Sequence, residues 1–274
     1  MIAPPFLQTL DHVPACTLAR VQGLLTDIDD TLTTDGAITP DALQALDELK
    51  AAGLRVVAIT GRPVGWSVPF AQACPLDAIV AENGAVALIR QADGSLRRSY
   101  QQEDAVRRQQ YQRMQTVLQD IEAQVPGARR AADSAGRETD IAIDHSEFTQ
   151  LPSQAIEQVV ALMQAAGMNA TVSSIHINGW YGPHNKLEGA RWILRELWGH
   201  KLHEELERWV YVGDSTNDQL MFEHLPLSVG VANVRRFVPQ LQHLPRYITA
   251  GERGAGFAEL AQALLRARSA SVPA

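Results

Sequence analysis

Three carboxylates and a threonine directly follow an apolar run near the N-terminus, in the segment GLLTDIDDTL at residues 23–32. If the run is a buried strand, Asp27 and Asp29 lie at its C-terminal end, where open α/β sheets bind their ligands. Their spacing of two residues places both side chains on one face of a regular strand. Carboxylates this close repel one another unless a cation or a shared proton relieves them. Mg²⁺ is the simplest such cation. The alternative interpretation is structural, because aspartates also cap helices or occupy turns.

The elements on either side of this segment alternate between strand and helix. Thr39 and Pro40 open a helix that ends at Gly53, and a β-branched strand follows at 54–59. A strand at 78–81, a turn at 82–84 and a strand at 85–89 come next, and the Asn-Gly pair in the turn favours a hairpin. Strand, helix and strand at this spacing predict a parallel sheet, and so an α/β, Rossmann-like three-layer core.

The character of the chain changes between residues 91 and 182. This stretch begins polar and then predicts a helix from residue 103, a strand at 139–143, a helix at 152–166 and strands at 169–174 and 175–181. The α/β pattern resumes with helices at 186–197, 218–224 and 257–266 and strands at 209–212 and 228–231. We therefore predict a core domain formed by 1–90 and 183–274, with an inserted α+β domain at 91–182.

Composition limits the classes of partner and the location. The 274 residues carry a formal net charge of −7, which disfavours a nucleic-acid-binding surface. Two cysteines, Cys16 and Cys74, suit a reducing compartment, and the N-terminus lacks the pattern of a signal peptide. No apolar stretch approaches membrane-spanning length. We expect a cytoplasmic protein, monomer or homodimer, with no membrane or nucleic-acid partner.

Four segments carry chemistry-bearing residues in a fixed order. They are DIDDT at 27–31, TGRP at 60–63, Lys186, and GDSTND at 213–218. Three of them follow predicted strands, and Lys186 opens a helix. Singly, each is more often a turn or a solvated residue, but the ordered set resembles the haloacid dehalogenase superfamily of phosphohydrolases over residues 23–265.

The resemblance implies a role for each matching position. Asp27 resembles the nucleophile, which forms an aspartyl-phosphate and binds the metal. Asp29 resembles the general acid and then the base, and offers its backbone carbonyl to the metal. Asp214 resembles the second side-chain metal ligand, while Asp218, a further candidate ligand, and Asn217 resemble supports for the metal waters and for Lys186. The catalytic candidates are Asp27, Asp29, Thr60 and Lys186; the substrate-binding candidates are Thr60, Gly61, Arg62, Asn83, Lys186 and Asn217; the metal candidates are Asp27, Asp29, Asp214 and Asp218.

The place of the insert indicates a branch of the superfamily. It lies between the second and third motifs, as in phosphatases resembling those of trehalose phosphate, sucrose phosphate and mannosyl-phosphoglycerate, and the segments ENGA at 82–85 and GAGF at 254–257 resemble that branch. The insert would close over the site as a cap and select the leaving group. Its candidate contacts are Arg137, Glu138, Asp140, His176, Asn178 and His184, whereas Trp180 and Tyr181 fit core packing better than sugar stacking.

These observations favour a Mg²⁺-dependent phosphatase that acts on a small phosphorylated metabolite, such as a sugar phosphate. A phosphomutase of the same branch, or a non-catalytic binding protein on this scaffold, are the alternatives. One position departs from the common pattern, because Asp30 stands where many members have Gly. Asp adopts left-handed backbone angles less easily than Gly but more often than most residues, so activity is not excluded.

Overall fold

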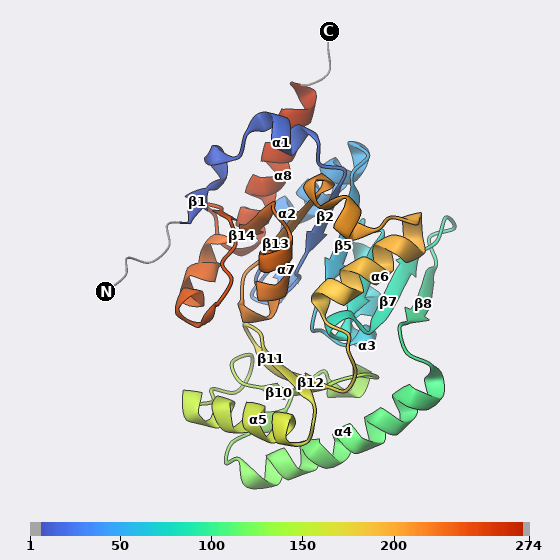
Figure 1. The fold of residues 1–274 in the computed structure, drawn as a ribbon, viewed down its shortest axis with the longest axis vertical. Coiled ribbons are helices and arrows are strands. Elements are labelled where there is room, and N and C mark those ends of the chain that lie inside the picture. The colour runs from blue at the N-terminus through green and yellow to red at the C-terminus, as the bar shows by residue number, and fades with distance from the viewer. Residues whose placement is uncertain (1–6, 271–274) are drawn as a thin grey trace.

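A computed structural model describes residues 7–270 of the chain, and Figure 1 shows two units that each contain one main sheet. The larger unit holds a nine-stranded sheet and the smaller one a four-stranded sheet. The chain passes from the large unit to the small one after Tyr100 and returns before Lys186. We call the small unit, residues 101–182, the cap, and the rest the core.

The core sheet is parallel over most of its width. Its strands run in the order β1, β15, β14, β13, β2, β5, β6, β7, β8, and only the β6–β7 and β7–β8 pairs are antiparallel. Because the middle strands are covered on both faces, they are apolar throughout rather than alternating. The bounds are β1 (Gln8–Thr9), β15 (Tyr247–Ile248), β14 (Ser228–Gly230), β13 (Trp209–Gly213), β2 (Gly23–Thr26), β5 (Arg55–Ile59), β6 (Ala78–Ala81), β7 (Val86–Arg90) and β8 (Leu96–Tyr100).

Helices cover both faces of this sheet and form two apolar clusters. One cluster contains residues of α1 (Ala15–Ala19), α2 (Pro40–Ala51), α3 (Val64–Ala73) and α8 (Arg253–Ser269). The other contains residues of α6 (Lys186–Trp198) and α7 (Gln219–His224). A short hairpin, β3 (Thr33–Thr34) and β4 (Ala37–Ile38), follows the first motif. The predicted three-layer α/β core is confirmed.

The cap is a four-stranded antiparallel sheet with two helices on one face. The strand order is β11 (Asn169–Val172), β12 (His176–Trp180), β10 (Ile141–Asp144) and β9 (Arg129–Arg130), and the helices are α4 (Asp104–Gln124) and α5 (Ser153–Ala165). Figure 1 places the cap strands between these helices and the core. Ile143 and Ile177 pack in the helix-side cluster. Since side chains alternate along a strand, the neighbouring His176 and Asn178 point toward the core.

Several elements were not predicted from sequence, among them the core strand β8 and helix α3. Strand β8 lies inside the range 91–182, yet it pairs with β7 in the core sheet, so the core continues to Tyr100. Helix α3 contains Pro69, and a proline inside a helix interrupts the pattern from which helices are predicted. The assignment of two domains remains a prediction, with its first crossing moved to residue 101. Within residues 7–270, no helix is both long and apolar enough to span a membrane.

Candidate active site

The topology brings the first and last motifs together at one edge of the core sheet. Strand β13 lies beside β2 in parallel, with Val212 opposite Thr26. The backbone N–H of Asp27 donates to the Val212 carbonyl at 2.9 Å, which continues this pairing into the motif. Asp27 and Asp214 therefore emerge from adjacent strand ends, as the sequence predicted.

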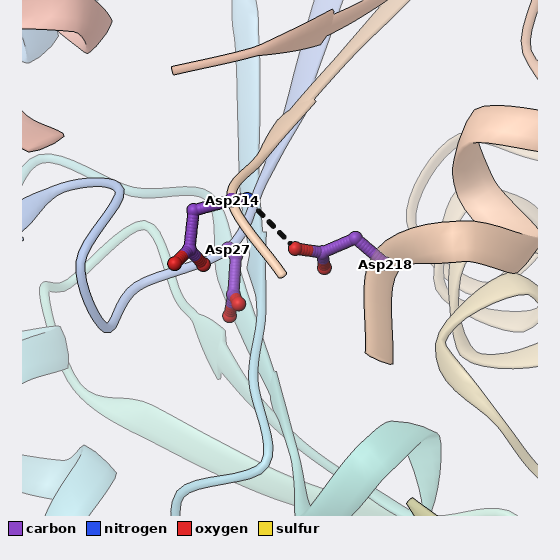
Figure 2. Close-up of side chains that lie close together, drawn as sticks. All are labelled: Asp27, Asp214 and Asp218. Atoms are coloured by element: carbon purple, nitrogen blue, oxygen red, sulfur yellow. Dashed lines mark hydrogen bonds between the residues drawn. The ribbon is translucent and has the colours of Figure 1, made fainter. Parts of the chain in front are cut away.

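Asp27, Asp214 and Asp218 form a buried acidic cluster (Figure 2). One carboxylate oxygen from each lies within 4.8 Å of the others. Burial raises the pKa of Asp214 well above its usual range, and the Asp218 and Asp27 carboxylates raise it further. Burial likewise raises the pKa of Asp27 to about 7, although Lys186 opposes the shift. A hard divalent cation would relieve this repulsion, so the donor set fits Mg²⁺ held by Asp27 and Asp214.

Lys186 is the cation that the chain itself supplies to this cluster. Its Nζ lies 2.8 Å from Asp27 Oδ2 and 2.7 Å from Asp218 Oδ1. Burial would lower the pKa of Lys186, but the Asp218 and Asp27 carboxylates outweigh it and raise that pKa above its ordinary value. The residue is placed by helix α6, whose first turn is capped by the Asn185 side chain accepting from Glu188 N at 2.9 Å. Lys186 therefore stays charged beside Asp27.

Asp218 is already engaged by the protein through both oxygens. Its Oδ1 accepts from Lys186 and from the Tyr211 hydroxyl, and its Oδ2 accepts from the backbone N–H groups of Asp214 and Ser215 at 2.8 and 3.0 Å. This arrangement favours the supporting role over direct metal coordination. Asn217 lies nearby and accepts from the Ser215 hydroxyl at 3.0 Å.

Asp29 lies outside the acidic cluster. Its carboxylate accepts from Arg62 Nε at 3.0 Å through both oxygens, and its side chain is 14% exposed. A contact between the Asp29 backbone carbonyl and the metal remains a prediction. Next to it, Asp30 has a φ of 53°, the left-handed conformation discussed for this position. The Asp30 carboxylate pairs with Arg253 Nε at 3.0 Å, which ties the loop to the start of α8.

The second motif places a hydroxyl and a backbone turn at the neighbouring strand end. Thr60 is fully buried after β5, and its Oγ1 accepts from the Arg62 backbone N–H at 3.0 Å. The hydroxyl proton of Thr60 remains available for a phosphate oxygen. The Gly61 carbonyl accepts from Arg137 Nη1 at 3.0 Å and from Asn178 Nδ2 at 3.2 Å. Both donors belong to the cap.

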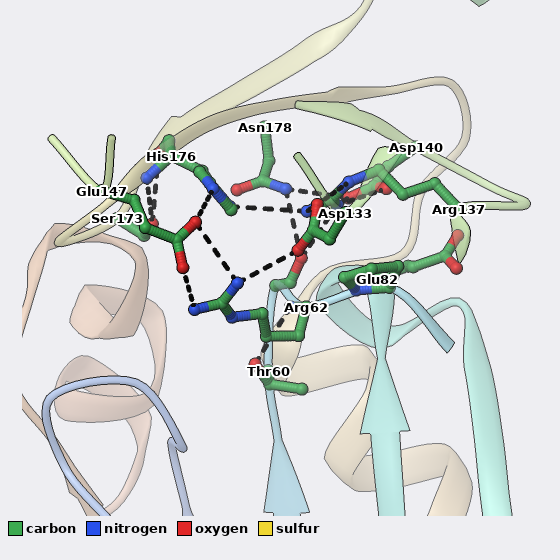
Figure 3. Close-up of polar contacts among 12 residues, drawn as sticks. Thr60, Arg62, Glu82, Asp133, Arg137, Asp140, Glu147, Ser173, His176 and Asn178 are labelled. Carbon is green, nitrogen blue, oxygen red and sulfur yellow. Dashed lines mark hydrogen bonds and ion pairs between the residues drawn. The ribbon is translucent and has the colours of Figure 1, made fainter. Parts of the chain in front are cut away.

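Arg62 does not point to solvent as a free anion-binding group. It is 5% exposed, and its guanidinium contacts Asp29 of the core together with Glu147 and Asp133 of the cap, at 2.8 and 3.2 Å for the latter two (Figure 3). Burial would raise the pKa of Glu147, but hydrogen bonds from His176 and Arg62 lower it to about 2. Arg62 thus joins the candidate acid Asp29 to the cap, a role that sequence alone did not indicate.

The predicted cap contacts divide into two groups. Arg137, Asp140, His176 and Asn178 gather above the Thr60 loop (Figure 3). Asn83 Nδ2 donates to Asp140 Oδ2 at 3.4 Å. Burial raises the pKa of Asp140 to about 7, opposed by Arg137.

The remaining candidates lie elsewhere. The Glu138 carboxylate pairs with Arg98 and Tyr100 of β8, and His184 lines a separate cavity. Trp180 and Tyr181 are 3% and 7% exposed within the cap cluster, which confirms core packing.

Sequence reasoning missed Asn233 and the buried glutamate Glu82. Asn233 Nδ2 donates to Asp214 Oδ2 at 3.1 Å and to the Asp30 carbonyl at 3.0 Å. It follows β14, so the rule of polar residues at strand ends would have found it. The Glu82 carboxylate accepts from the backbone N–H of Val64 in the core and from the backbone N–H and hydroxyl of Thr139 in the cap. Glu82 therefore connects the core to the cap.

Comparisons with known proteins bear on the family resemblance and on the fold. Residues 24–122 match the model of the haloacid dehalogenase-like hydrolases. Thermoplasma acidophilum 0175 has a similar structure, with 16% identity, a TM-score of 0.66 and coverage of 89% of this chain and 98% of that one. The sucrose-phosphatase of Synechocystis, solved with sucrose and phosphate, gives 16% identity, a TM-score of 0.64 and the same coverages of 89% and 98%. A putative HAD/COF-like hydrolase from Plasmodium vivax gives 17% identity, a TM-score of 0.66 and coverages of 92% and 98%.

The comparison with curated proteins gives no match. Residues 24–122 resemble the haloacid dehalogenase-like hydrolases, and the solved structures show that the chain shares their overall fold. The resemblance predicted from the sequence is confirmed.

Proposed function

We propose that the chain is a Mg²⁺-dependent phosphatase that hydrolyses a small phosphorylated metabolite of the sugar-phosphate class. The observation that carries the proposal is the buried contact of Asp27 with Lys186, 2.8 Å apart, beside the Asp214 carboxylate. A carboxylate held between a fixed cation and a candidate metal site is a suitable nucleophile for phosphoryl transfer. The bound metal would neutralise charge on the phosphoryl oxygens.

The residues divide the reaction into two steps. In the first, an Asp27 oxygen attacks phosphorus, the bond from phosphorus to the leaving oxygen breaks, and Asp29 gives that oxygen its proton. In the second, Asp29 takes a proton from water, the water oxygen attacks phosphorus, and Asp27 is released with free phosphate. Lys186 and the Thr60 hydroxyl hold the phosphoryl oxygens throughout.

The cap supports a hydroxylated leaving group. Its core-facing side presents an amide, an imidazole and a carboxylate: Asn178 contacts the Gly61 carbonyl, and Glu147 contacts both His176 and Arg62. The sucrose-phosphatase of similar fold also favours this class. In the described part of this lining, Arg62 and Arg137 are both paired with carboxylates, which favours an uncharged leaving group. Docking of the cap would exclude water from the phosphoryl site.

Phosphate release from a panel of sugar phosphates, nucleotides and phosphoglycerates tests the proposal. We expect selective release with Mg²⁺ and none with chelator. Formation of an isomeric sugar phosphate without free phosphate would instead indicate a phosphomutase. Binding of panel members without any turnover in Mg²⁺ would contradict both activities.

A further inference from the structure

A cavity of about 500 Å³ lies at the surface of the core, between the outer face of α6 and the segment 200–203 that follows this helix. Among the residues that the structure describes, its wall includes none of the candidate catalytic, metal-binding, substrate-binding or cap-contact residues. Its arginines, Arg191 and Arg195, lie about 8–14 Å along the helix axis from Lys186. The cavity is therefore separate from the phosphoryl site, and nothing in the proposed mechanism uses it.

The face of α6 that lines the cavity carries charged groups and one aromatic ring. Glu188, Trp192 and Arg195 recur at the spacing of three and four residues that aligns side chains along one side of a helix. The opposite face is buried in the core and consists of Leu187, Ala190, Ile193 and Leu194. Trp192 is only partly buried, because it packs against this apolar cluster and also lines the cavity. The cavity therefore has aromatic surface between its charged groups.

The second wall depends on the turn that ends α6. Gly199 has a φ of 67°, a left-handed conformation that glycine adopts without steric cost, so the chain leaves the helix here. His200 then fixes the following segment through both ring nitrogens. Its Nε2 accepts from Arg55 Nη1 at 2.8 Å, since a guanidinium can only donate, and its Nδ1 donates to Glu205 at 2.6 Å. The segment is thereby held beside the last turns of α6.

The wall carries an excess of positive charge in a chain whose formal net charge is −7. Three cations line it, Arg191, Arg195 and Lys201, against the single carboxylate of Glu188. Arg191 pairs with Glu188 at 2.5 Å and Lys201 with Glu204 at 2.8 Å, but these side chains are all at least 38% exposed. Exposed ion pairs contribute little, so an incoming anion replaces them easily. The Arg195 guanidinium has no acidic partner within residues 7–270.

The charged groups and the indole together define the chemistry of a ligand. A guanidinium binds phosphate oxygens through two parallel N–H groups, and an ammonium binds them as a point charge. An indole stacks on flat aromatic rings, including the bases of nucleotides. The volume of the cavity is in the range of sites that hold small organic ligands. A molecule with phosphate groups at one end and an aromatic base at the other uses both features.

We propose that this cavity binds a nucleotide, whose phosphates contact the three cations of the wall and whose base stacks on Trp192. The site goes beyond the proposed hydrolysis, since it needs neither the metal nor Asp27. A nucleotide bound there stabilises the folded protein by mass action and leaves the phosphoryl site open to its own substrate.

Isothermal titration calorimetry of the full-length protein with adenosine diphosphate (ADP), adenosine and pyrophosphate tests the site. Chelator is present throughout, so that neither turnover nor binding through a metal at Asp27 contributes to the signal. We expect saturable binding of ADP, about tenfold or more tighter than that of adenosine or pyrophosphate, because each of these lacks one half of the contacts. Absence of ADP binding up to millimolar concentration, or equal affinity for ADP and pyrophosphate, overturns the proposal.

Matched variants separate this cavity from the reaction centre. Arg195→Gln removes the unpaired cation and is expected to weaken ADP binding about tenfold. Trp192→Leu should weaken ADP binding about tenfold through the loss of base stacking, while the affinity for pyrophosphate stays unchanged. Arg266→Gln, which removes the same charge from an exposed position of α8, is the control and keeps wild-type affinity. Equal ADP affinity of Arg195→Gln and wild type contradicts the site, whatever the outcome of the phosphate-release assay.

Discussion

Acidification should destabilise this protein through His184, a buried histidine in the segment that joins β12 to α6. Burial is the cause of its lowered pKa, which falls from 6.5 to about 4. In the unfolded chain the imidazole takes up a proton near its ordinary pKa, whereas the folded protein resists protonation until a much lower pH. The unfolded state therefore binds more protons between these two values, and the free energy of unfolding falls as the pH is lowered.

The size of the effect follows from the two pKa values. The stabilisation is fully present above pH 6.5 and is lost progressively as the pH falls toward about 4. Between pH 7 and pH 5 the linkage relation gives a loss of about 2 kcal/mol from this one group. His184→Phe keeps an aromatic ring against Trp180 and removes the titration.

Urea unfolding at pH 7 and pH 5 measures this difference. We expect the wild-type free energy of unfolding to fall by about 2 kcal/mol more than that of His184→Phe over this interval. His203→Phe, at a site whose side chain is 63% exposed, is the control and should follow the wild type. Equal pH dependence of His184→Phe and wild type would refute the reasoning.

Three further predictions concern the acidic cluster and the attachment of the cap. Asp214→Ala should raise the Mg²⁺ concentration for half-maximal activity by about tenfold or more, as a Mg²⁺ titration measures, while the exposed Asp120→Ala leaves it unchanged. Lys186→Met should lower the free energy of unfolding in chelator by about 3–5 kcal/mol, because Asp27 and Asp218 lose their buried cation. Added Mg²⁺ should restore part of this free energy. Equal urea unfolding curves for the variant and the wild type would contradict the pairing. Glu82→Gln should lower the free energy of unfolding by about 2–4 kcal/mol, because the amide NH₂ of Gln would face N–H and O–H donors where a Glu82 oxygen now accepts. The control Glu138→Gln, at a partly exposed ion pair, should change the free energy of unfolding by under about 1 kcal/mol.

The sequence predicted the fold where local pattern and burial agree. The strand at 78–81 and the hairpin after it formed as expected, with Glu82 and Asn83 at φ values of 50° and 55°. Strand β8 escaped because its exposed edge carries Arg97 and Arg98 rather than apolar residues. Its place in the sheet depends on pairing with β7, which is a tertiary interaction that sequence periodicity does not record.

The site was predictable in its centre but not at its boundary with the cap. Asp27 and Asp214 follow adjacent strands, so the strand-end rule placed them together. The contacts of Arg62 with Glu147 join residues far apart in the sequence, and no spacing rule connects them. Which cap residue faces the core depends on the register of β10 and β12, where Ala142 lies opposite Asn178. A change of one residue in that register would turn the other set of side chains toward the site.

Mass spectrometry of acid-quenched turnover tests the central claim most directly. With Mg²⁺ and a sugar phosphate that is hydrolysed, we expect a phosphoryl group on the peptide that contains Asp27, and none in chelator. Asp27→Asn should carry no phosphoryl group and release no phosphate while keeping the wild-type circular dichroism spectrum. Phosphate release by Asp27→Asn at the wild-type rate, or a phosphoryl group on a different residue, would contradict Asp27 as the nucleophile.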